Sequence, residues 1–145
     1  MRSKEFLARL DHKRISDAIA EAELRTSGEI RVYVHRGSLE GDALPLAQQK
    51  FQELGMEKTA ARNAVLILVA PRAQKFAVIG DEGVHQKCGA EFWEQLVAEM
   101  RTHFKSENFT EAILHGIRST GELLARFFAR ENNDRDELPN DVIEG

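Results

Sequence analysis

The sequence predicts an α/β fold, a three-layer helix-sheet-helix sandwich around a small mixed β-sheet. The run AVLILVA at residues 64–70 is unbroken, apolar and too short for a globular helix, which is typical of a strand covered on both faces. A second apolar run, Phe76 to Ile79, follows after a link too short for a helical crossover, so the two should form a central antiparallel hairpin. A strand and an amphipathic helix precede this hairpin, and a right-handed strand-helix-strand crossover would make the first strand parallel to 64–70.

The first half of the chain supplies helices and one strand. Residues 3–9 have apolar side chains at helical spacing and predict a short opening helix. Asp11 is a good N-cap for a second helix, which should end near Gly28, where glycine can adopt a positive φ. Residues 29–35 alternate polar and apolar side chains, which predicts a strand near the sheet edge. The amphipathic segment 43–55 predicts a third helix ended by its glycine.

The second half predicts two long helices and a tail. After Asp81 we expect a polar stretch and then a helix at about 89–104, in which apolar residues recur every four positions. Asn108 and Glu111 have the spacing of a capping box for the last helix. Gly116 and Gly121 lie within that helix, where each costs about 1 kcal/mol relative to alanine, so we expect close helix contacts there. A single domain should span residues 1–131. The acidic segment 132–145 is predicted to be a mobile tail, with docking of residues 138–142 as the alternative.

Composition limits the classes of function. The 145 residues, 42% hydrophobic and 30% charged, fit one soluble domain with a sizeable core. One cysteine and an N-terminus without a secretory pattern favour the cytoplasm. No segment approaches the roughly 20 apolar residues that span a bilayer, so we expect no direct membrane insertion. The net charge of -4, with Lys and Arg interspersed among acids, argues against nucleic acid as a partner.

Polar side chains should meet at one edge of the sheet. With the first two strands parallel and the third antiparallel, Glu29 and Asn63 at strand starts lie beside Asp81 at a strand end, with Glu82 close by. These four residues offer hard oxygen ligands suited to calcium or magnesium. Two carboxylates brought near each other could also have separated pKa values useful for proton transfer. The remaining alternative is that these are caps and turn residues, with Glu29 paired to Arg62.

Several segments together resemble the TPM domain family. They are TSGEIRVYV, FQELGMEKTAARNAVLILVA, FAVIGDEG and the helical FWEQL with GIRSTGELLARFF, and the likeness covers roughly residues 15–128. The resemblance implies a helix-sheet-helix sandwich, divalent-cation binding on an acidic loop surface, often of calcium, and an acid phosphatase activity in the plant branch. It also implies accessory roles for membrane complexes or receptors. Many relatives carry a signal peptide and a membrane anchor, whereas this sequence is similar to the short stand-alone type. Lys87 stands about where family members place a further acid.

From these observations we expect a non-enzymatic binding or accessory module with no catalytic residues. It would be a monomer that binds calcium or magnesium and a protein partner from a membrane-associated complex. The serines lack a nucleophile elbow, and Gly80-x-x-Gly83 lacks the lysine and hydroxyl residue of a phosphate loop. The alternative function is a weak metal-assisted acid phosphatase, in which Asp81 and Glu29 would hold the cation and a neighbouring carboxylate would act as acid or base.

Overall fold

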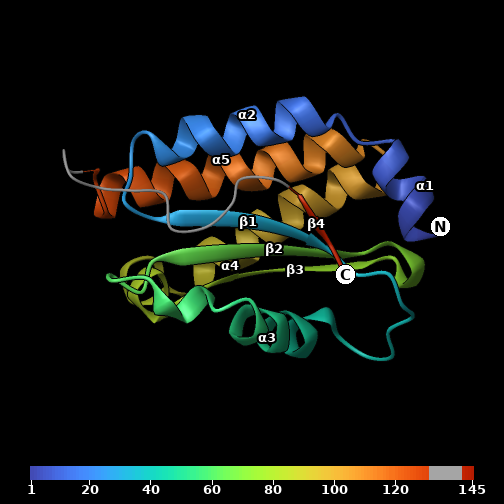
Figure 1. Cartoon of the computed structure of the whole chain (residues 1–145), viewed down its shortest axis with the longest axis horizontal. Helices are drawn as coiled ribbons and strands as arrows, with labels where there is room; N and C mark the ends of the chain where they lie inside the picture. Colours follow the sequence, from blue (N-terminus) through green and yellow to red (C-terminus); the bar gives the residue numbers. More distant parts are fainter. Residues whose placement is uncertain (131–141) are drawn as a thin grey trace.

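The computed structural model describes residues 1–130 and 142–145 (Figure 1). Four strands form one sheet in the order β3-β2-β1-β4. In chain order the elements are α1 (Ser3–Ala8), α2 (His12–Glu23), β1 (Glu29–Val34), α3 (Ala43–Glu53), η1 (Met56–Lys58), β2 (Ala64–Ala70), η2 (Pro71–Ala73), β3 (Lys75–Gly80), α4 (Glu82–Lys105), α5 (Phe109–Phe127) and β4 (Ile143–Glu144).

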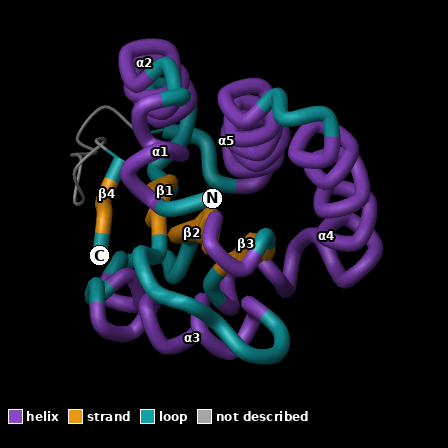
Figure 2. The backbone as a smooth tube through the Cα atoms, turned by 90° about the vertical axis from the view of Figure 1, so that its right-hand side faces the viewer, coloured by secondary structure: helices purple, strands orange, loops and turns teal. Residues whose placement is uncertain are grey.

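The helices cover both faces of the sheet, as the sequence predicts. Helices α2, α5 and α4 lie over one face, and α3 covers the other (Figure 2). The larger core cluster fills the space between the sheet and α2, α4 and α5, and includes the fully buried Ile19, Ile67 and Ile117. A smaller cluster around Phe51 and Leu66 packs beneath α3. The predicted fold class, with its mixed sheet, is therefore confirmed. In the described part of the chain, the helices lack the combination of length and apolarity that a membrane span requires.

The strand pairing agrees with the prediction in direction, but not in the positions of β1 and β3. Strand β1, predicted near the sheet edge, lies between β2 and β4. Strand β2 pairs parallel with β1 and antiparallel with β3, and every β2 residue is buried. Strand β3 lies at the edge of the sheet, and only its two middle residues are buried. Its apolar run arises because α3 covers one face and α4 the other. A strand at the edge of the sheet can therefore have both faces covered by helices, and an apolar run does not show that the strand has a neighbouring strand on each side.

The end of the chain adds a short strand to the sheet. Strand β4 pairs parallel with β1 at Tyr33 and Val34, and the Gly145 amide donates to the Val34 carbonyl at 3.1 Å. The mobile tail is predicted at 132–145, and most of it lies outside the described residues, which omit 131–141. The same is true of 138–141, the greater part of the segment 138–142 that is predicted to dock in the alternative. The sequence does not predict the strand at Ile143–Glu144.

The predicted end of the second helix is wrong, and so is the prediction of a polar stretch without helix before residue 89; the helix that follows the break at Gly89 agrees with the predicted 89–104. Helix α2 ends at Glu23, and Gly28 has no positive φ. Gly28 instead permits close packing, since a Cβ atom there would lie 3.0 Å from the Asn63 carbonyl oxygen. Helix α4 begins directly after Asp81, so the predicted polar stretch is helical, and Gly89, with φ of 73°, interrupts the helix at the predicted start. The Asp81 cap explains the earlier start, because its side chain accepts from the Glu82 amide.

The last helix confirms the glycine contacts but not the capping box. Asn108 precedes α5 without a side-chain cap, and Glu111 pairs instead with Arg14 at 2.9 Å. A Cβ atom at Gly116 would lie 2.9 Å from the Met100 side chain, and one at Gly121 would lie 2.9 Å from the Ala22 Cβ. Both glycines therefore allow α5 to approach its neighbours within this chain.

Candidate functional site

The predicted polar residues do gather where β1 and β2 begin and β3 ends. Glu29 is the register partner of Ala64, and the Asp81 amide donates to the Ala64 carbonyl at 2.9 Å. Ala64 thus stands between the two acidic residues. With neighbouring strands about 4.8 Å apart, the backbones of Glu29 and Asp81 are about 10 Å from each other. Strand polarity places both acids at the same end of the sheet, two strands apart.

Arg62 and Asp81 form an ion pair at this end of the sheet, with two hydrogen bonds between their side chains. Arg62 donates from Nε to Asp81 Oδ2 at 2.7 Å and from a terminal nitrogen to Asp81 Oδ1 at 2.9 Å. The Asp81 side chain is 6% exposed and that of Arg62 is 43% exposed. The hydrogen bond and charge of Asp81 raise the pKa of Arg62. The alternative that pairs Arg62 with Glu29 is wrong, because the partner is Asp81.

Backbone packing holds this ion pair in place. Arg62 has a φ of 52°, in the left-handed region, where the chain turns immediately before β2. The Gly83 amide donates to the Arg62 carbonyl at 3.0 Å. A Cβ atom at Gly83 would lie 2.5 Å from the Ala61 carbonyl oxygen and 2.6 Å from that of Arg62. Glycine is therefore required where the first turn of α4 meets the chain before β2.

The other predicted ligands have separate surroundings. Asn63 is buried, and its side-chain amide donates to Ser27 Oγ at 3.1 Å. Glu29 is buried beside Arg31. Burial lowers the pKa of Arg31, while the charge of Glu29 acts in the opposite direction. Glu82, by contrast, is exposed on the first turn of α4.

In the present arrangement, hydrogen bonds already engage side chains that a divalent cation would need as ligands. Calcium takes about six to eight oxygen ligands, whereas both carboxylate oxygens of Asp81 accept hydrogen bonds from Arg62. The side-chain amide of Asn63 is engaged with Ser27. Within residues 1–130 and 142–145, no three His, Cys, Asp or Glu side chains form a group that could hold a metal. A cation at Asp81 would first have to displace Arg62.

A cavity of about 330 Å³ adjoins the ion pair on the α3 side of the sheet. Gln48 and Gln52 of α3 and Glu57 of η1 line it together with Arg62 and Asp81. The charge of Glu57 is a further cause of the raised Arg62 pKa. No sequence pattern singles out these residues, because polar side chains on an amphipathic helix are ordinarily solvated surface. Their position next to residue 62 depends on how α3 packs against the sheet.

The comparisons with known proteins agree with this architecture. The fold and the sheet edge define a class of small α/β sandwich domains with a charged turn between an edge strand and a helix. The family model of the TPM domain matches residues 1–123, and the chain belongs to that family. The chain is also similar to a solved structure, the NMR structure of the BA42 protein from the psychrophilic bacterium Bizionia argentinensis sp. nov. The two chains are 37% identical, the TM-score is 0.83, and the match covers 92% of each. No curated protein matches the chain.

Proposed function

We propose that the chain is a non-enzymatic binding module that serves a protein partner of a membrane-associated complex. The observation that carries this proposal is the Arg62–Asp81 ion pair beside the 330 Å³ cavity. A general base or a metal ligand needs an accessible carboxylate oxygen, whereas the Asp81 side chain is 6% exposed and both of its oxygens already accept hydrogen bonds from Arg62. The partly exposed guanidinium and the amides of Gln48 and Gln52 offer donors and acceptors that suit the peptide groups of a partner.

Site-specific photo-crosslinking tests the binding role. A photoreactive residue at Gln52 should give a discrete crosslinked product in extracts that contain the partner, while one at the exposed Glu21 on α2 should not. Arg62→Asn should weaken the Gln52 product, because it removes the guanidinium, and asparagine tolerates the left-handed backbone found there. Equal products from both positions, insensitive to residue 62, would contradict a specific site at this end.

Calcium or magnesium binding at Glu29, Asn63, Asp81 and Glu82 is a second, separate proposal. Since a cation would compete with Arg62 for Asp81, Arg62→Asn should strengthen binding and Asp81→Asn should abolish it. Isothermal titration calorimetry with each ion measures both effects. Binding that Asp81→Asn leaves unchanged would place any cation elsewhere.

The acid phosphatase alternative is tested by hydrolysis of p-nitrophenyl phosphate with and without magnesium. The binding proposal expects no activity that depends on Asp81. Hydrolysis that persists through successive purification steps and disappears in Asp81→Ala would overturn it, provided that the variant keeps the amide spectrum of the folded protein.

A further inference from the structure

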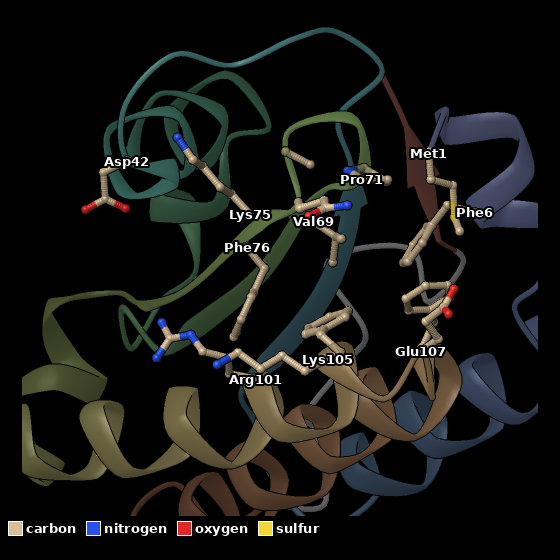
Figure 3. Close-up of a pocket in the computed structure, with 14 residues that line it drawn as sticks. Met1, Phe6, Asp42, Val69, Pro71, Lys75, Phe76, Arg101, Lys105 and Glu107 are labelled. Carbon is tan, nitrogen blue, oxygen red and sulfur yellow. The ribbon is translucent and has the colours of Figure 1, made fainter.

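Figure 3 shows a cavity of about 720 Å³. Its lining includes Val69 and Phe76, so it lies at the opposite end of the sheet from Arg62 and Asp81. Its walls come from the carboxyl end of β2, the start of β3, the last turns of α4, and α1. This volume falls in the range of about 300–1,000 Å³ that is usual for small-molecule sites. The cavity is therefore large enough to hold a ligand of moderate size.

Four phenyl rings form a continuous apolar surface in this cavity. The ring centroids of Phe76 and Phe104 are 4.7 Å apart, those of Phe104 and Phe109 are 6.4 Å apart, and those of Phe109 and Phe6 are 5.0 Å apart. The row runs from β3 through the α4–α5 junction to α1. Except for Phe6, these rings are only half-buried. Some of their apolar surface thus remains open to an incoming molecule.

Unneutralised positive charge lies beside the rings. Arg101 and Lys105 stand one turn apart on α4, and the Arg101 guanidinium is 6.0 Å from the Phe76 ring centroid. Within the described residues, neither side chain has a carboxylate partner. Lys75, on the cavity wall, donates to the Gly41 carbonyl.

The two acids on the cavity wall are already engaged. Glu107 pairs with Arg9 at 3.1 Å and not with Arg101, Lys105 or Lys75. Asp42 accepts from the Leu44 amide at the start of α3. The cavity therefore combines an apolar surface with a net positive rim. An arginine guanidinium and a nearby ammonium group are the usual partners of a carboxylate or phosphate.

We propose that this cavity binds a small amphipathic anion. The apolar body of the ligand lies along the phenyl rings, and its acidic head group lies between Arg101 and Lys105. Lys75, whose present partner is a neutral carbonyl, adds attraction from the opposite wall. This site shares no residue with the Arg62–Asp81 end, so it stands or falls independently of the function proposed above.

Titration with decanoate tests the proposal, with decylammonium as a probe of equal chain length and opposite charge. Calorimetry and amide chemical shifts on the full chain should show saturable binding of decanoate, with the largest shifts at residues 75, 76 and 104. Decylammonium should bind at least about tenfold more weakly. Decyl phosphate serves as a third arm and shows whether the site prefers a carboxylate or a phosphate head group.

Charge variants connect this binding to the named residues. The double variant Arg101→Gln/Lys105→Gln should weaken decanoate binding about tenfold. The matched variant Lys87→Gln/Arg118→Gln removes two exposed cations from α4 and α5 and should leave the affinity unchanged. Arg101→Glu/Lys105→Glu should reverse the preference in favour of decylammonium. The proposal is overturned by absence of saturable decanoate binding, by equal affinity for both probes, or by equal losses in the two double glutamine variants.

Discussion

The close approach of α5 to α2 at Gly121 makes a sharp prediction about stability. A Cβ atom at this position would lie 2.9 Å from the Ala22 Cβ, well inside the roughly 3.5–4.0 Å at which carbon atoms pack. Gly121→Ala gains about 1 kcal/mol of helix propensity but adds a methyl group to a filled interface, which costs about 1–3 kcal/mol. Ala22 has no side-chain rotamer that could move away, so α2 itself must shift. We expect a net destabilisation of about 1 kcal/mol.

Gly116→Ala provides the matched comparison within the same helix. Its added Cβ would also meet close atoms, but these are the ends of the flexible Met100 and Ile67 side chains. Methionine can rotate away at little cost. The gain in helix propensity and the cost of crowding should therefore nearly cancel in the free energy of unfolding. Although both glycines are buried on α5, only Gly121→Ala should lower the free energy of unfolding.

Urea denaturation followed by circular dichroism measures both variants. A loss of 1 kcal/mol in a chain of this size lowers Tm by about 2–4 °C. Ala22→Gly in the Gly121→Ala background loses about 1 kcal/mol of helix propensity but relieves about 2 kcal/mol of crowding. It should therefore recover about 1 kcal/mol, with a coupling energy of about 2 kcal/mol in the double-mutant cycle. If Gly121→Ala is more stable than the wild type, or if the two positions do not couple, the helices do not approach as closely as described.

Three further predictions follow from local contacts. Gly83→Ala places a Cβ against two backbone carbonyls that cannot rotate away, so it should cost about 3 kcal/mol or more in urea denaturation; a neutral result would refute the packing at this turn. Asp11→Ala removes the acceptor of the Arg14 amide and should cost about 1 kcal/mol, more than Asp42→Ala, whose cap bond is longer at 3.3 Å. Burial raises the pKa of the Cys88 thiol, so alkylation by iodoacetamide at pH 8 should be slower than for an unfolded control. Because the folded thiol keeps its proton to higher pH, its contribution to stability should be complete below about pH 8.5, the pKa of an unperturbed thiol, and be lost as the pH rises through the folded pKa.

The sequence predicts the sheet well where burial is continuous. Strand β2 occupies 64–70 as predicted, because a strand enclosed by helices on both faces leaves an unbroken apolar run. Strand β4 cannot be predicted from the sequence, because a strand of two residues is too short to show a periodicity. Its partner, β1, is also more than a hundred positions away in the chain. The helical turns before Gly89 have no apolar periodicity to indicate them, because the Asp81 cap begins a helix in a mostly polar stretch.

The candidate site could be predicted in position but not in chemistry. Strand directions alone bring Glu29 and Asp81 to one end of the sheet. The pairing of Asp81 with Arg62 depends on a left-handed backbone at Arg62 and on the contact that Gly83 allows. Neither feature has a periodic signature in the sequence. Metal binding at this end therefore remains a prediction that depends on displacing an existing partner.

The two ends of the sheet differ in how their charges are compensated, and this difference bears on where a ligand would bind. Where β1 and β2 begin, Asp81 and Arg62 neutralise each other, so a charged ligand that binds either side chain alone must break their ion pair. At the carboxyl ends of the same two parallel strands, Arg101 and Lys105 have no carboxylate partner among the described residues, and a ligand breaks nothing. Open α/β sheets generally bind ligands outside the carboxyl ends of their parallel strands. The acidic turn after β3 draws attention in the sequence, whereas the cations without a carboxylate partner among the described residues lie at the basic, aromatic end, where we propose that the anion binds.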